Sequence, residues 1–276
     1  MLMIVNVEDR PPQNLKEKAL SIIRPFEIRT EIKSQENLQI MNIRYIRKRG
    51  EIRFRKIYEL CSGRMKTVLC SKNISLEHTY LIRFSDIDYK KIILGNYICY
   101  LIEKSNISSS DLKIGFYDPY GENSLLLQRL LKYTSNILVV SDMLRFYENE
   151  AERISKETGA SVIVSNDISD LSKYSFLAAP CIIEKSINIG TDGIIFTAAP
   201  PLCNVSGTVI TDYHTLIPKE FSMLKPDDID ETYFLAALFS LCSVSSLSEI
   251  VPVSCGNENE VFTSECCIRR LRSLLT

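Results

Sequence analysis

His214 is the one candidate for proton transfer in the sequence, because a neutral imidazole can act as a general base near neutral pH. His214 follows Asp212 and Tyr213, so an acid, a phenol and an imidazole occur together. We therefore predict His214 and Asp212 as catalytic residues. The alternative is that His214 has a structural or solvent-exposed role.

A second candidate is the segment 118–124, with the sequence DPYGENS, which separates an apolar run from a predicted helix. Backbone N–H groups in such a turn can face a ligand, and glycine permits a tight backbone there. An ordinary strand-to-helix turn is the alternative. The predicted ligand-binding residues of this turn are Asp118, Tyr120, Gly121, Glu122, Asn123 and Ser124.

Small residues end two further apolar runs, at 177–180 (LAAP) and 197–200 (TAAP). Small side chains leave room for a flat ligand, so we predict Thr197, Ala198 and Ala199 beside one. The alternative is that these residues only end strands.

No metal site is predicted, because the nine cysteines and two histidines do not have the spacing of zinc ligands. The N-terminal residues do not resemble an export signal, so we expect reduced thiols and a cytoplasmic protein. No membrane association is expected either. The longest apolar stretch, 233–244, is shorter than the roughly 20 residues of a membrane span.

A fold must hold these candidate residues in place. After Leu112 the sequence alternates short apolar runs with helical segments. Short continuous apolar strands separated by helices are typical of a parallel sheet covered on both faces, which binds ligands at the carboxyl ends of its strands. The fold class is therefore α/β, with a doubly wound, mainly parallel sheet. Strands are expected within 113–118, 136–142, 161–167, 176–180, 193–200 and 208–213, and helices over 122–134, 145–158 and 230–245, the last of them packed on this sheet.

A small α+β domain is predicted before this sheet. A helix is expected over 14–24, where Pro25 ends it, and a strand over 26–34. The runs 39–48 and 51–60 are interpreted as a basic hairpin around Gly50. The predicted domains are 1–85 and 86–276, and the helix over 86–104 can belong to either.

Charge is divided unevenly between the two parts. Residues 1–75 contain 16 Lys and Arg against 8 Asp and Glu, a net charge of +8, whereas the whole chain has −1. Two parts of opposite charge make a homodimer conceivable. The basic hairpin is either a surface for a polyanion or a solvated outer face; without a nucleic-acid-binding motif, we expect no nucleic acid partner.

The stretch from Asn136 to Pro180, NILVVSDMLRFYENEAERISKETGASVIVSNDISDLSKYSFLAAP, resembles the dinucleotide-binding domain of shikimate dehydrogenases and glutamyl-tRNA reductases. The resemblance covers roughly 112–215 and implies a Rossmann-like sheet that binds NAD or NADP. It also implies that Asp142, at the end of the second strand, hydrogen-bonds the ribose hydroxyls of adenosine. The alternative is that Asp142 caps the next helix.

The sequence departs from these families at the turn after the first strand. Their G-x-G-x-x-G motif is absent, and within 118–124 only Gly121 remains. Asp118 and Glu122 would also repel a phosphate at a helix N-terminus. Two hypotheses follow: an oxidoreductase that binds a nucleotide or nicotinamide cofactor and a small-molecule ligand, or a non-catalytic binding or scaffold protein without the cofactor-binding turn.

Overall fold

The chain forms two compact units in a computed structural model that describes residues 2–35, 38–60, 66–71, 73–242 and 250–275. The N-terminal unit comprises Met1–Asp86 and Ile217–Ser245, and the C-terminal unit comprises Ile87–Leu216 and Ser246–Thr276. The first division lies beside the one expected from the sequence. The structure differs in assigning 217–245 to the N-terminal unit.

The N-terminal unit contains a five-stranded mixed sheet with the order β2-β3-β1-β4-β5. Strands β2 and β3 are antiparallel, whereas β1 is parallel to both β3 and β4. Met3, Val5, Ile43 and Tyr45 contribute to the buried cluster on one face. The strands are β1 (Leu2–Asp9), β2 (Phe26–Gln35), β3 (Leu38–Arg47), β4 (Thr67–Cys70) and β5 (Ile82–Arg83), and helix α1 (Leu15–Ile23) connects β1 to β2.

The predicted hairpin around Gly50 is wrong. Residues Phe54–Leu60 form helix α2, and the hairpin of this unit is β2 with β3. Ile57 of α2 is buried, and Phe54 and Tyr58 pack on the same cluster. These positions follow helical spacing, which the alternation at the start of the run concealed.

The last helix expected on the parallel sheet also belongs elsewhere. Helix α7 (Glu231–Cys242) contacts β1 of the N-terminal unit, with Phe234, Leu235 and Leu238 buried. Because the helix is apolar around most of its circumference, its sequence pattern does not specify the sheet it covers. The short helix α6 (Lys219–Ser222) precedes it.

Acidic neighbours balance part of the basic charge in the N-terminal unit. Among the basic residues around the predicted hairpin, those with ion pairs are Arg44 with Glu8, Arg47 with Asp9, Lys48 with Glu27, and Arg55 and Lys56 with Glu59. This pairing is what a solvated outer face requires. That no nucleic acid binds there stays a prediction.

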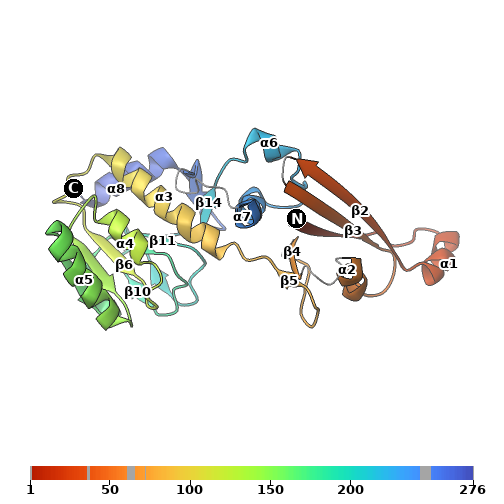
Figure 1. Cartoon of the computed structure of the whole chain (residues 1–276), viewed down its shortest axis with the longest axis horizontal. Coiled ribbons are helices and arrows are strands. Elements are labelled where there is room, and N and C mark those ends of the chain that lie inside the picture. The colour runs from red at the N-terminus through yellow and green to blue at the C-terminus, as the bar shows by residue number, and fades with distance from the viewer. Residues whose placement is uncertain (1, 36–37, 61–65, 72, 243–249, 276) are drawn as a thin grey trace. The chain divides into compact units, whose positions relative to one another are not determined.

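The C-terminal unit contains a six-stranded parallel sheet with the order β13-β11-β9-β6-β7-β8. Figure 1 labels two of its strands, β6 and β11. The first three strands in the chain, β6, β7 and β8, follow one another toward one edge of the sheet. The last three, β9, β11 and β13, follow one another from β6 toward the other edge, which is the Rossmann order. The fold is thus the predicted doubly wound α/β sheet. Its strands are β6 (Ile114–Tyr117), β7 (Ile137–Val140), β8 (Val162–Ser165), β9 (Phe176–Ala179), β11 (Ile194–Thr197) and β13 (Thr208–Ile210).

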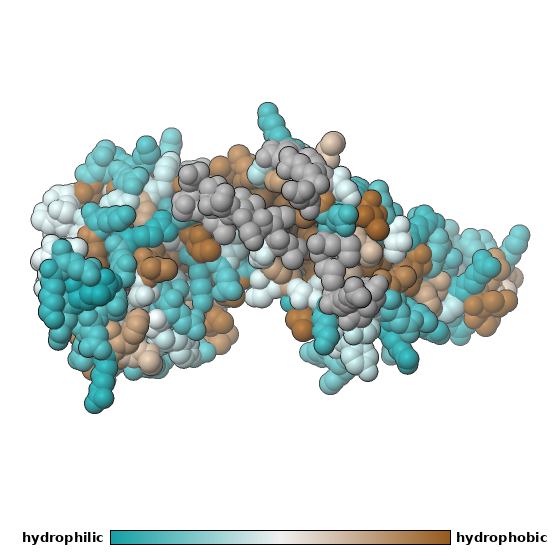
Figure 2. Space-filling view, viewed as in Figure 1, coloured by the Kyte–Doolittle hydropathy of each residue, from teal (hydrophilic) through white to brown (hydrophobic). Residues whose placement is uncertain are grey.

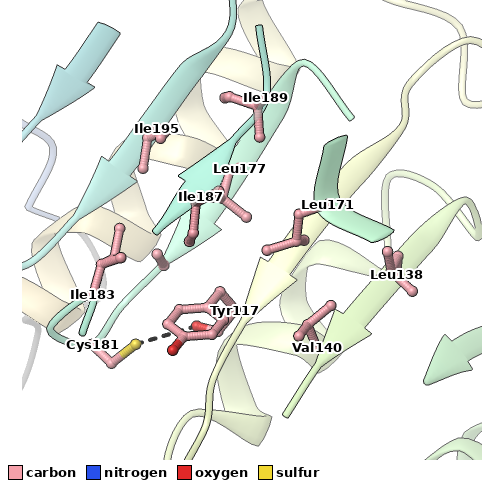
Figure 3. Packing of buried hydrophobic residues seen from close by; sticks show 11 residues of the cluster. Tyr117, Leu138, Val140, Leu171, Leu177, Cys181, Ile183, Ile187, Ile189 and Ile195 are labelled. Atoms are coloured by element: carbon pink, nitrogen blue, oxygen red, sulfur yellow. Dashed lines mark hydrogen bonds between the residues drawn. The ribbon is translucent and has the colours of Figure 1, made fainter. Parts of the chain in front are cut away.

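Different elements cover the two faces of this sheet. On one face, Phe116 packs on Tyr147 of α5 and Phe196 on Tyr97 of α3. On the other face lies a cluster that includes Leu138, Leu177 and Ile195 (Figure 3), together with Leu171 of the 3-10 helix η1 (Ile168–Lys173). The covering helices include α3 (Ile87–Ser105), α4 (Ser124–Leu130), α5 (Leu144–Thr158) and α8 (Ser264–Leu275).

Two small sheets complete the unit. Strands β10 (Ile187–Asn188) and β12 (Val205–Ser206) pair in parallel. Strands β14 (Asp212–His214), β15 (Ser254–Gly256) and β16 (Val261–Thr263) form an antiparallel sheet, and β14 follows β13 directly in the chain.

Leu177 lies at the centre of the parallel sheet and is fully buried. We expect Leu177→Ala to lower the free energy of unfolding by about 2–5 kcal/mol, because it removes buried methyl groups and leaves a cavity. Urea denaturation measures this change. Ile163→Ala on edge strand β8, where the side chain is 60% exposed, is the control and should change stability by less than about 0.5 kcal/mol. Equal effects would contradict the described core.

Candidate functional site

The crevice that the strand order predicts lies where β6 and β9 are neighbours, because the connections leave these strands toward opposite sides of the sheet. Parallel strands bring their carboxyl ends to one edge. Asp118 follows β6, Asp142 follows β7 by two residues, and Cys181 follows β9 by two residues. These positions, far apart in the chain, therefore belong to one edge of the sheet.

Asp118 is fully buried and its carboxylate is satisfied within the protein. It accepts hydrogen bonds from the backbone N–H of Asn123 at 2.8 Å, from Asn123 Nδ2 at 3.1 Å and from the hydroxyl of Tyr147. Burial and this hydrogen bond raise the pKa of the Tyr147 phenol. A carboxylate of the chain itself thus lies at the N-terminus of α4, where a Rossmann fold usually receives a phosphate.

Gly121 is the one position of this turn with a left-handed backbone, at φ +71°. A Cβ atom there would also lie 3.2 Å from Cδ1 of Phe146 and 3.5 Å from Cβ of Met143. Glycine is therefore required by the backbone conformation and favoured by the close approach of α5.

The side chains around Gly121 extend away from it. The Tyr120 hydroxyl donates to Glu184 at 2.8 Å, and Glu122 forms an ion pair with Lys91 of α3 at 3.1 Å. Both Tyr120 and Glu122 are exposed, so neither is buried within the turn. Ser124 is the first residue of α4.

Asp142 is exposed, and its carboxylate oxygens lie 2.8 and 3.0 Å from Nζ of Lys185. The alternative interpretation of Asp142 as a helix cap is wrong, because Met143 occupies the N-cap position of α5. Ser141 supplies the hydroxyl that accepts from the Met143 N–H. The carboxylate of Asp142 thus remains accessible at the end of β7.

Thr197 has a structural contact at the predicted ligand position. Its hydroxyl lies 2.9 Å from the carbonyl oxygen of Cys181 and 3.1 Å from that of Ala199, which connects the ends of β9 and β11. Thr197 and Ala198 are buried, whereas Ala199 is partly exposed. Of the three, Ala199 is the residue that a ligand could reach.

The predicted catalytic pair lies on β14, outside the parallel sheet. Asp212 is 3.5 Å from Lys90 and accepts from the Thr211 hydroxyl at 3.1 Å. No hydrogen bond joins Asp212 to His214 within the part of the chain that the structure describes. Between them, Tyr213 is buried and its hydroxyl lies 3.0 Å from the carbonyl oxygen of Thr197.

Helix α3 contacts both the turn 118–124 and strand β14, and sequence reasoning did not predict this contact. Its consecutive residues Lys90 and Lys91 pair with Asp212 of β14 and Glu122 of the turn. Positive charge is unfavourable near a helix N-terminus, so two lysines in the first two turns were a signal that acidic partners lie nearby.

Cys181 is a second residue at this edge that sequence reasoning did not assign to the site. Its thiol donates to the carbonyl oxygen of Tyr117 at 3.4 Å. Burial, with the Asp118 carboxylate as a smaller cause, raises the pKa of Cys181 to about 12. The group is therefore a protonated thiol at neutral pH and is not an activated nucleophile.

The N-terminal unit has a separate groove of about 930 Å³ that contains none of the predicted site residues. Its lining includes Asn6 and Asn42, whose Oδ1 atoms are buried without a hydrogen-bond partner among the described residues. Asn6 Nδ2 donates to Asp228 at 3.0 Å, which fixes the orientation of that amide. These unpaired acceptors would suit groups that donate hydrogen bonds.

Neither a metal site nor a membrane-spanning helix is found among the described residues. Among them, no cluster of three or more His, Cys, Asp or Glu side chains is arranged to hold a metal ion. None of the helices there has the length and apolar character that crossing a membrane requires.

The similarity of this chain to known proteins is low. No model of a protein family matches the chain, and no curated protein matches it. Among solved structures it is similar to Δ1-pyrroline-2-carboxylate reductase from Thermococcus litoralis, determined with NADH and L-proline, with 13% identity and a TM-score of 0.28 over 71% of this chain and 68% of that one. It is also similar to L-tryptophan dehydrogenase from Nostoc punctiforme, with 13% identity and a TM-score of 0.30 over 99% of this chain and 80% of that one.

At TM-scores this low the likeness carries no argument, and the Rossmann assignment rests on the strand order itself. The resemblance to shikimate dehydrogenases and glutamyl-tRNA reductases stays a prediction.

The contact between Tyr147 and Asp118 can be tested by stability. Tyr147→Phe removes one donor from a buried carboxylate, and we expect the free energy of unfolding to fall by about 1–3 kcal/mol. Tyr120→Phe is the matched control, because its hydroxyl bonds Glu184 at the surface and should contribute less than about 0.5 kcal/mol. Chemical denaturation of both variants measures the difference. A neutral Tyr147→Phe substitution would show that Asp118 does not depend on this donor.

The thiol of Cys181 should resist alkylation. At pH 8 we expect iodoacetamide to modify the partly exposed Cys203 well before Cys181, because Cys181 is buried and the high pKa leaves little thiolate. Mass spectrometry of peptides over a time course measures the two rates. Equal rates would contradict both the burial and the raised pKa.

Proposed function

We propose that the C-terminal unit binds a nucleotide at the carboxyl ends of β6, β7 and β9, and that NAD or NADP is the nucleotide of an oxidoreductase. The observation that carries the proposal is an accessible carboxylate, Asp142, at the end of the second strand of a Rossmann-ordered sheet. In such sheets an acidic residue near this position accepts hydrogen bonds from ribose hydroxyls.

The ribose end of a dinucleotide fits the residues present. A ligand could replace the contact of Asp142 with Lys185, because both side chains of this ion pair are about half exposed. Such a pair contributes roughly 0–1 kcal/mol, so opening it costs little. Lys185 also places a positive charge beside the position of the ribose.

The pyrophosphate end does not fit in the usual way. The carboxylate of Asp118 lies at the N-terminus of α4, and Phe146 covers Gly121. Phosphates of a bound nucleotide would instead need the positive charges of Lys91 and Lys185 at the rim. The proton-transfer role predicted for His214 and Asp212 belongs to this same proposal.

A second candidate is a non-catalytic binding or scaffold protein. The observation that favours it is the closed set of hydrogen bonds around Asp118, which leaves the turn after β6 satisfied without any ligand. Under this alternative the crevice has kept the architecture of a nucleotide-binding fold without its function.

A thermal-shift panel distinguishes the two candidates. NAD, NADH, NADP, NADPH, ATP and S-adenosylmethionine are each added to the full chain at millimolar concentration. A ligand at about 100 times its dissociation constant adds roughly 2.7 kcal/mol of stability, which raises the melting temperature by several degrees. We expect a shift with one of the nicotinamide cofactors.

Asp142→Asn should abolish this shift while leaving the melting temperature of the free protein nearly unchanged. Glu152→Gln is the control, because it removes a comparable exposed ion pair, with Lys156, from the surface of α5. No shift with any member of the panel favours the scaffold protein. A shift that persists in Asp142→Asn would overturn the ribose contact.

A further inference from the structure

Strand β2 is a long edge strand, and no element of the described chain pairs with its outer side. It contains ten residues, and Thr30, Glu31 and Ile32 near its centre are exposed. The outer edge of such a strand presents a row of unpaired N–H and C=O groups that can pair with another chain.

We propose that β2 and α1 form a two-fold interface between two copies of this chain, in which the β2 strands pair antiparallel about Thr30. Such pairing extends the sheet across the symmetry axis, so that the same surface is used on both subunits. The proposal concerns the N-terminal unit and is independent of nucleotide binding.

The charge pattern of β2 is complementary to itself about Thr30. Because side chains alternate along a strand, Glu27, Arg29, Glu31 and Lys33 share one face. In the proposed pairing Glu27 lies opposite Lys33 of the second copy, and Arg29 lies opposite its Glu31. Symmetry repeats both pairs, which gives four cross-strand pairs of opposite charge.

The neighbouring registers are disfavoured by the same charges. Moving the axis to position 29 places Arg29 opposite Arg29 and Glu27 opposite Glu31. Moving it to position 31 places Glu31 opposite Glu31 and Arg29 opposite Lys33. Like charges directly opposite each other are destabilising, so among these three registers the pattern favours the one centred on Thr30, which also forms the most pairs of opposite charge.

The monomer leaves part of this pattern unused. Arg29 pairs with Glu27 of its own strand at 2.8 Å, but neither Glu31 nor Lys33 has an ion pair among the described residues. The second copy would supply their partners. Charged residues usually protect an edge strand from pairing, and here their order favours pairing with the same strand in the reverse direction.

Apolar surface lies beside the same edge. On the opposite face of β2, Ile28 would lie opposite Ile32 of the second copy, and Ile32 is 59% exposed in the single chain. Helix α1 ends three residues before Phe26 and exposes Leu15, Leu20, Ile22 and Ile23. Figure 2 shows hydrophobic surface at the end of the molecule where Figure 1 labels α1.

Helix α1 has its apolar side directed to solvent. Its buried residue is Ser21, which lies on the polar side of the helix. A helix of nine residues is too short to be stable in water without packing, so an uncovered apolar side is unfavourable. Because α1 precedes Phe26, it would lie near Ser34 of the second copy. Its apolar side would enlarge an interface that two strand edges alone would leave small.

Crosslinking tests the register. In the full chain, Thr30→Cys places two cysteines opposite each other with Cα atoms about 4.5–5.5 Å apart, which suits a disulfide. Ile32→Cys is the matched control, because its two copies would lie about 13 Å apart along the strands. Under mild oxidation we expect a disulfide-linked dimer from Thr30→Cys but not from Ile32→Cys or the wild type. Equal crosslinking of the two variants would overturn the register.

Charge exchange tests the interface in solution. Light scattering after size exclusion should give twice the chain mass of 31.5 kDa for the wild type. Arg29→Glu and Glu31→Arg should each be monomeric, because each variant places like charges opposite one another. Mixed together, they should form a heterodimer, since the carboxylate introduced at position 29 of one chain then lies opposite the guanidinium introduced at position 31 of the other.

Arg55→Glu and Glu59→Arg on α2 are the controls, because they change the charge equally away from the edge and should leave the dimer intact. Circular dichroism checks that each variant is folded. Ile23→Lys on α1 should weaken the dimer. A monomeric wild type, or single charge variants that do not associate when mixed, would overturn the proposal.

Discussion

A buried carboxylate must find hydrogen-bond donors within the protein, and the candidate site of this chain is arranged around that requirement at Asp118. Its donors come from the next turn, through Asn123, and from helix α5, through Tyr147. These contacts fix the end of β6, the start of α4 and the position of α5 relative to both. The path of the turn at Gly121, under Phe146, follows from this arrangement.

In Rossmann folds an acidic group for the ribose usually occurs together with a free helix N-terminus for the phosphates. The hydrogen bonds of Asp118 leave only the first of these in this chain. The end of β7 retains an accessible acidic group at Asp142, which suits a ribose. The turn after β6 has its helix N-terminus occupied by the chain's own negative charge, which opposes a phosphate. Lys91 and Lys185 supply the positive charge at the rim, each held by an acidic side chain. A nucleotide would thus bind here by displacing side-chain ion pairs, without a ready-made backbone cradle.

The N-terminal unit uses charge differently. Most of the basic side chains between positions 44 and 56 pair with acids of the same unit, so the positive charge of that segment is partly balanced within the unit. Along edge strand β2 the two signs alternate in an order that matches the reversed strand. The order of these charges along β2, more than their net charge, therefore determines which strand could pair with this edge.

The sequence by itself determined the six strands of the parallel sheet and helices α1, α3 and α5, because these depend on local periodicity. It could not determine that Phe54–Leu60 is a helix, since a short run satisfies two periods at once, or that α7 covers the N-terminal sheet, since an apolar helix fits either sheet. It named Asp118 and Asp142 but not their partners. Tyr147, Lys185, Lys91 and Cys181 reach these positions only when the sheet and its helices pack, so the tertiary structure decided which charge is buried and which is exposed.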